Sequence, residues 1–157
     1  LTIATAIAIR DSGLPQPGCL FAISPWANLA QTGAAYAAVL HDPMLTREGL
    51  QEFADAYLQG EGPHHPLASP ALADLHDLPP MLLHAGGAEI LASDTTLLAE
   101  RAGLAGVEGR AEIWPEMIHV WHVMHPVLAA GRKAIANGGA FIKATMDGAN
   151  PVTPRVP

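Results

Sequence analysis

The amino-acid sequence predicts an α/β fold, with a doubly wound, mostly parallel sheet of about three strands and helices on its faces. Two short, continuous apolar runs, residues 19–23 and 81–87, are typical of strands covered on both faces. Residues 110–114 alternate polar and apolar side chains, as a strand with one open face does. Helical patterns separate these strands, and such alternation favours a parallel sheet.

Two helices are predicted in the first part of the chain. Residues 1–9 are apolar on every face, which is typical of a buried helix, and Gly13 is placed to end it. The segment 46–60 has Thr46 as an N-cap and Glu48 in its first turn. Apolar residues then recur at helical spacing, so we expect an amphipathic helix there.

The second part of the chain predicts two more helices, residues 93–104 and 126–146. Gly138 and Gly139 weaken the latter by about 1 kcal/mol each relative to alanine. Between the two halves, residues 61–80 contain prolines and no periodicity, which indicates a long ordered loop.

Composition limits the number of domains in the chain and the kinds of partner that it can bind. With 157 residues, half of them hydrophobic, the chain has enough apolar surface for one modest core. We expect residues 1–146 to form that unit and residues 147–157 to be a disordered tail. A net charge of −7 and scattered basic residues exclude a nucleic-acid partner. No apolar run is long enough to predict a membrane span.

Cysteine and histidine usage predict neither a disulfide nor a metal site. Cys19 has no second cysteine to pair with, so a reducing location, the cytoplasm, is expected. His119, His122 and His125 are spaced by three, but on a helix the first and last would point well apart. No cysteine or carboxylate completes the set, so we predict no metal and no cofactor.

Two loops that follow predicted strands carry residues suited to acid–base chemistry. Glu89 follows the strand 81–87, and His119 follows the strand 110–114. Working residues of doubly wound sheets lie at the carboxyl ends of the strands, so these side chains can meet. A carboxylate fixes the tautomer of a histidine and stabilises its protonated form. Together they are the acid and base of a nucleophilic triad.

Six motifs, in the same order, resemble landmarks of the bacterial hormone-sensitive-lipase-like esterases, a family of α/β-hydrolases. The resemblance covers roughly residues 1–146. The motifs are SPWANL at 24–29, DPML at 42–45, DAYL at 55–58, PLASP at 66–70, LPPMLL at 78–83 and WPEMIHVW at 114–121.

The resemblance implies a carboxylic-ester hydrolase with a triad in the order serine, acid, histidine. The histidine corresponds to His119. The acid corresponds to Glu89, about thirty residues earlier, with Asp94 as the reserve. Val120 and Trp121, which follow the histidine, are weaker candidates for the substrate pocket.

In the family pattern, the nucleophile elbow and the His-Gly-Gly oxyanion motif lie upstream of Leu1. The sequence contains neither. The chain is therefore expected to be the carboxyl-terminal half of a catalytic domain and to be inactive by itself.

The expected partners are a small ester substrate, the other half of the domain, and a second copy bound through residues 110–114. The alternative is a catalytically incomplete fragment with only a structural, complementing or binding role.

Overall fold

Three parallel strands form the centre of the protein in a computed structural model that describes residues 1–39 and 41–148. They are β1 (Leu20–Ile23), β2 (Met81–Gly86) and β3 (Gly109–Trp114), and they pair in chain order with β2 in the middle. Every residue of β2 is buried, as expected for a strand with a neighbour on each side and helices on both faces. The predicted α/β fold is confirmed.

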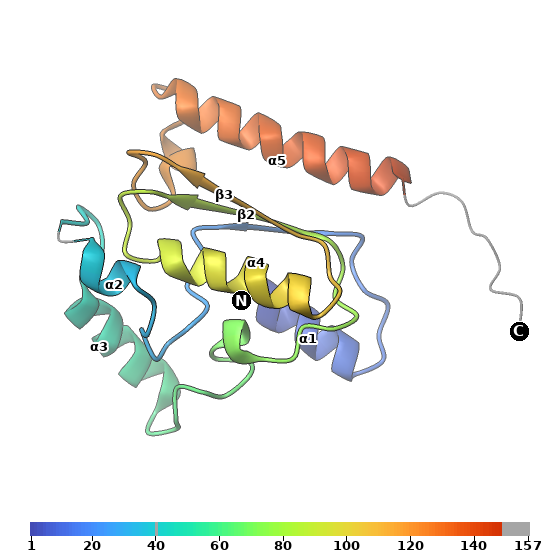
Figure 1. Cartoon of the computed structure of the whole chain (residues 1–157), viewed down its shortest axis with the longest axis horizontal. Coiled ribbons are helices and arrows are strands. Elements are labelled where there is room, and N and C mark those ends of the chain that lie inside the picture. The colour runs from blue at the N-terminus through green and yellow to red at the C-terminus, as the bar shows by residue number, and fades with distance from the viewer. Residues whose placement is uncertain (40, 149–157) are drawn as a thin grey trace, which may run out of the picture.

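Helices cover both faces of this sheet (Figure 1). α1 (Thr2–Asp11) and α4 (Ala92–Leu104) pack on one face, and α5 (Ala129–Gly148) lies along the other. The largest cluster of buried apolar side chains lies between the sheet and the first two helices. It includes Ile3, Ile7, Leu20, Leu83 and Leu98. The helix predicted from residues 1–9 is present, but only one of its faces is buried. Ile3, Ala4, Ala6 and Ile7 are buried, whereas Leu1, Thr2 and Thr5 are exposed.

α3 (Arg47–Leu58) begins where its N-cap predicts, because the Thr46 hydroxyl accepts a hydrogen bond from the Gly49 backbone N–H. Three shorter elements lie in segments for which the sequence predicts no helix or strand. They are α2 (Ala35–Ala38), η1 (Pro70–Leu72) and η2 (Trp121–Met124). None is longer than four residues, which is too short for hydrophobic periodicity to predict.

α5 differs from its prediction at both ends. It begins at Ala129, because the backbone N–H groups of Val127 and Leu128 donate to the carbonyl oxygen of Met124 and so continue the turn of η2. It ends at Gly148, so Asp147 and Gly148 are helical although the sequence indicates a tail from 147 onward. The rest of the predicted tail, residues 149–157, lies outside the described residues.

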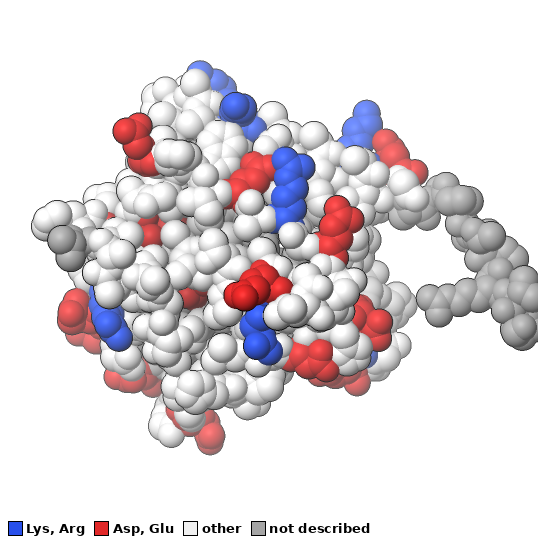
Figure 2. All heavy atoms as spheres, in the orientation of Figure 1, with Lys and Arg blue, Asp and Glu red and all other residues white. Residues whose placement is uncertain are grey.

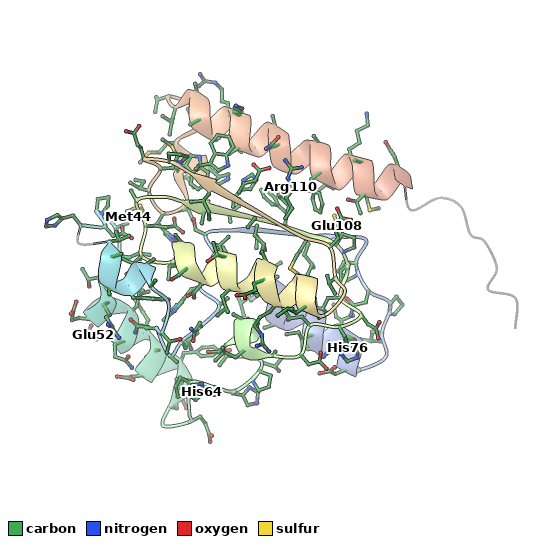
Figure 3. All side chains as sticks on the ribbon, in the orientation of Figure 1. Met44, Glu52, His64, His76, Glu108 and Arg110 are labelled. Carbon is green, nitrogen blue, oxygen red and sulfur yellow. The ribbon has the colours of Figure 1, made fainter. Side chains whose placement is uncertain are left out.

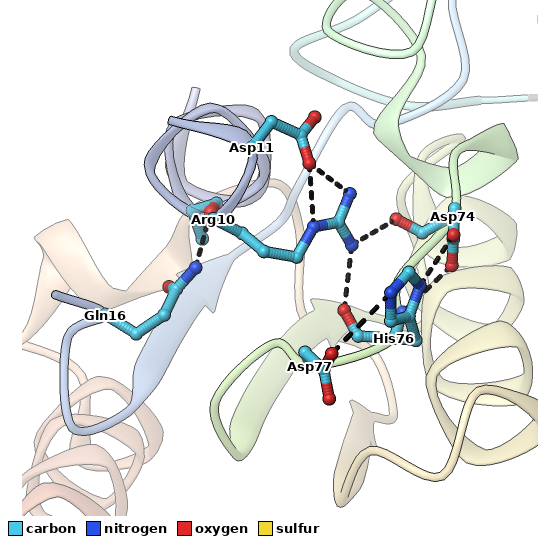
Figure 4. Close-up of polar contacts among 7 residues, drawn as sticks. Arg10, Asp11, Gln16, Asp74, His76 and Asp77 are labelled. Atoms are coloured by element: carbon cyan, nitrogen blue, oxygen red, sulfur yellow. Dashed lines mark hydrogen bonds and ion pairs between the residues drawn. The ribbon is translucent and has the colours of Figure 1, made fainter. Parts of the chain in front are cut away.

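On the face drawn in Figure 2, charged side chains are separated by large uncharged areas. One group of polar contacts ties the end of α1 to the loop before β2 (Figure 4). The Arg10 guanidinium donates to the carbonyl oxygens of Asp74 and His76 and pairs with Asp11. Among the described helices, none is long and apolar enough to cross a membrane.

A buried histidine pair joins β2 to η2. His84, in the middle of β2, has its Nδ1 atom 3.0 Å from Nε2 of His122. The Glu112 carboxylate lies 3.4 Å from the other nitrogen of His84, and Arg110 pairs with Glu112. Burial, with His84 close by, lowers the pKa of His122 to about 4, and burial also lowers the pKa of His84. Both rings are therefore neutral near pH 7.

Two adjacent glycines of α5 are expected to respond in opposite ways to alanine. A Cβ atom at Gly138 would collide with the Phe21 ring, whereas one at Gly139 would meet open space. We expect Gly139→Ala to raise the free energy of unfolding by up to about 1 kcal/mol and Gly138→Ala to lower it. Urea unfolding followed by circular dichroism measures both. Stabilisation by Gly138→Ala would contradict the packing of Phe21 against α5.

The histidine pair predicts a loss of stability in acid. Because the pKa of His122 is depressed on folding, protons bind the unfolded chain first as the pH falls from 6.5 towards 4. This histidine's contribution to stability is complete above pH 6.5 and falls by at most about 3 kcal/mol at pH 4. His122→Gln removes the titration and retains an amide beside His84, so its unfolding free energy should vary less with pH. Urea unfolding at several pH values tests this, and equal slopes in the two proteins would refute it.

Candidate active site

The loops that follow β2 and β3 are in direct backbone contact. The N–H of Gly87 donates to the carbonyl oxygen of Trp114 at 2.8 Å, and the N–H of Ala88 donates to that of Met117 at 3.0 Å. Gly86 makes this approach possible, because a Cβ atom there would collide with the Met117 carbonyl group. The hydrogen bonds fix the separation of the two loops and therefore of the side chains they carry.

Glu89 and His119, the two side chains expected to form the acid and base, come together at this junction. Oε2 of Glu89 lies 3.7 Å from Nδ1 of His119, which is longer than a hydrogen bond but close enough for an ion pair. The carboxylate is fully buried, whereas a fifth of the His119 side chain is exposed. Nδ1 of His119 has no other hydrogen-bond partner. The ring therefore presents one nitrogen to the buried acid and retains access to solvent.

Asp94, the reserve acid, has different neighbours. One of its oxygens accepts hydrogen bonds from the backbone N–H groups of Ala27 and Asn28, both at 2.9 Å, and from the Tyr36 hydroxyl at 3.2 Å. Burial raises the pKa of Asp94 to about 6, and these donors oppose that rise. Asp94, in the first turn of α4, thus holds the loop that follows β1.

The two pocket candidates lie just beyond His119. Val120 is half-buried and has a left-handed backbone, with φ of 46°. Trp121 is fully buried and packs against the rings of Trp114 and His122, with centroids 5.7 and 4.0 Å away. A ring without exposed surface does not support the expected role for Trp121 in a substrate pocket, because the aromatic cluster covers it.

Ser24, the first residue of the SPWANL motif, lies beside the acid and the histidine, although the sequence did not predict it as a site residue. It directly follows β1 and is 4% exposed. Its hydroxyl donates to Oε2 of Glu89 at 2.8 Å and accepts from the N–H of Val120 at 3.1 Å. The available signal was its position at the carboxyl end of a buried strand, the edge that carries Glu89 and His119.

The side chains that could hold a metal are dispersed. Across residues 1–39 and 41–148, no group of three or more histidine, cysteine, aspartate or glutamate side chains is placed to bind one ion. His119 faces Glu89, and His122 faces His84. Figure 3 draws the described side chains on the ribbon, with His64 and His76 labelled on different segments.

Known proteins match most of the chain. The α/β hydrolase fold family matches residues 1–123. An acetyl-hydrolase of Streptomyces hygroscopicus is 45% identical over 91% of the chain and 48% of its own length. A putative acetyl-hydrolase of Mycobacterium tuberculosis is 30% identical over 91% of the chain and 46% of its own length. The chain thus spans about half the length of the curated relatives it matches.

Solved structures agree with the sequence matches. The esterase EstE5 superposes with a TM-score of 0.90 and 40% identity, covering 92% of this chain and 49% of its own. An esterase of the bacterial hormone-sensitive lipase family gives a TM-score of 0.89 and 39% identity, covering 91% and 48%. The chain belongs to the α/β-hydrolase fold family and corresponds to the carboxyl-terminal half of a bacterial hormone-sensitive-lipase-like esterase.

Proposed function

We propose that this chain supplies the acid and the base of a carboxylic-ester hydrolase, whose serine and oxyanion donors belong to the preceding half of the domain. The observation that carries the proposal is the pair of Glu89 and His119, held by hydrogen-bonded loops at the carboxyl edge of the sheet. A buried carboxylate facing an accessible imidazole is the arrangement that a serine nucleophile requires.

In this proposal, Nε2 of His119 takes the proton of the serine hydroxyl while the serine oxygen bonds to the ester carbonyl carbon. Nδ1 of His119 faces Glu89, which stabilises the imidazolium. The imidazolium then protonates the departing alcohol as the ester C–O bond breaks. Water repeats the sequence on the acyl-enzyme and releases the acid. No cofactor enters these steps.

The position of α1 supports a serine supplied from upstream. Leu1 and Thr2 line a cavity together with Ala22, Ser24 and Trp26. A residue joined to Leu1 would therefore lie at the sheet edge that carries the acid and histidine. The start of a helix also presents free N–H groups, which favour developing negative charge.

The chemical class of substrate is an ester with a small or medium acyl group. Two relatives are named acetyl-hydrolases, and EstE5 was soaked with p-nitrophenyl butyrate. Those facts concern the relatives, and they direct the choice of substrate for this chain. p-Nitrophenyl acetate and butyrate are the appropriate first probes.

We also propose a cytoplasmic homodimer. Within the described residues, β3 is an edge strand, and Ile113 on it is 40% exposed. An open strand edge is a surface for pairing with another chain. The single cysteine, Cys19, is compatible with a reducing location.

The activity proposal is tested by joining the upstream half of the S. hygroscopicus acetyl-hydrolase to Leu1, a fusion that supplies the serine. We expect the fusion to hydrolyse p-nitrophenyl butyrate and the isolated chain to be inactive. His119→Ala or Glu89→Gln should lower kcat of the fusion by about 10³- to 10⁴-fold. Robust hydrolysis by the isolated chain would contradict the division of the triad.

Asp94→Asn is the matched control for the acid. It neutralises a second buried carboxylate in the same segment, and kcat should fall by less than about tenfold. A loss as large as that of Glu89→Gln would move the catalytic role to Asp94.

The dimer proposal is tested by light scattering after size-exclusion chromatography. Ile113→Lys places a charge on the edge strand, and we expect it to convert dimer to monomer. Met44→Lys, at an exposed position outside β3 (labelled in Figure 3), should leave the dimer intact. A wild-type chain that is monomeric at all concentrations would refute the dimer.

A further inference from the structure

Ser24 connects the acid and the histidine loop through one hydroxyl group. Its proton is donated to Oε2 of Glu89, the same oxygen that lies 3.7 Å from Nδ1 of His119. Its oxygen accepts the N–H of Val120, the residue after the histidine. The backbone N–H of Ser24 donates to the carbonyl oxygen of His84 in β2. One residue, directly after β1, is thus bonded to β2 and to the loops that follow β2 and β3.

The backbone around this hydroxyl is strained. Ser24 has φ of 47° and Val120 has φ of 46°. Both values lie in the left-handed region, which residues other than glycine seldom adopt. Strained residues persist where the surrounding structure fixes them, and they cluster at functional sites. Here the left-handed backbone of Ser24 directs its hydroxyl between the two loops. An extended backbone at this position would direct the hydroxyl elsewhere.

The hydroxyl limits how the carboxylate can turn. Oε1 of Glu89 has no hydrogen-bond partner, so the bond from Ser24 is the only one that fixes the carboxylate in the described chain. Without it, Glu89 could rotate about its last torsion and move its negative charge away from Nδ1 of His119. Such small displacements of a catalytic group reduce rates strongly.

We propose that Ser24 is a positioning residue for the triad, which orients the Glu89 carboxylate and holds it in register with His119. This role rests on the proposed function, since it assumes that Glu89 and His119 act as acid and base. Ser24 touches neither substrate nor the reacting atoms, and it acts through Glu89.

In the fusion, Ser24→Ala should lower kcat on p-nitrophenyl butyrate by about tenfold to a hundredfold, with KM changed by less than about threefold. Ser24→Gly removes the same hydroxyl and relieves the left-handed strain, so it should be the more stable variant with the same loss of kcat. If the less stable of these two variants also had the clearly larger loss of kcat, the proposal would be overturned.

Ser69 provides a matched control. It is a fully buried serine whose hydroxyl accepts from the Leu29 N–H and donates to the Pro63 carbonyl oxygen. Ser69→Ala should lower the unfolding temperature and leave kcat unchanged. An equal loss of kcat in Ser69→Ala would show that any buried serine bond has the effect, and would overturn the assignment to Ser24.

A double-substitution cycle tests the route of the effect. Because Ser24 acts through the Glu89 carboxylate, Ser24→Ala should cost nothing further in the Glu89→Gln fusion. Independent, multiplicative losses would contradict the proposal.

A second measurement separates this inference from the proposed activity. In the 157-residue chain, ¹H–¹⁵N NMR should detect the His119 Nδ1–H facing a carboxylate, and Ser24→Ala should shift that signal in the same direction as Glu89→Gln. An inactive fusion with this shift would refute the proposed function while showing that Ser24 still orients the Glu89 carboxylate towards His119. An active fusion with no shift and no loss of kcat would refute the positioning role alone.

Discussion

The loops after β2 and β3 can touch because β2 ends in a residue without a side chain. At Gly86 the Met117 carbonyl group lies where any other residue would place its Cβ atom. That approach allows two backbone hydrogen bonds between the loops, and these bonds bring a buried carboxylate to a partly exposed imidazole. Every feature of the site that involves both loops depends on this contact, which no conservative substitution at Gly86 could preserve.

Two buried acids lie five positions apart and have separate tasks. Asp94 accepts three hydrogen bonds and holds the loop after β1 in place. That loop begins at Ser24, whose hydroxyl reaches Glu89. Asp94 thus stabilises the loop whose first residue, Ser24, holds Glu89. Each carboxylate has one oxygen without a partner, but the other oxygen of Asp94 accepts three hydrogen bonds, whereas Oε2 of Glu89 accepts only the one from Ser24 and faces His119.

The sequence predicted the sheet and the four long helices, because apolar runs and helical periodicity extend over several residues in these segments. It also predicted the approach of Glu89 to His119, because each residue follows a predicted strand. It did not predict α2, η1 or η2, which are short and depend on contacts with distant residues. Ser24 was missed for the same reason. Its role depends on partners 65 and 96 positions away, and no local pattern encodes them.

The pairing of Glu89 with His119 is made entirely by contacts within this chain, a fact with a thermodynamic consequence. The entropy lost in ordering the acid and the base is paid when this half folds, before any nucleophile approaches. In the proposed enzyme, the other half then has to place its serine and oxyanion donors beside an acid and a base that are already ordered. Activity regained on recombination would therefore report docking, and its concentration dependence would measure the affinity of two halves of one sheet.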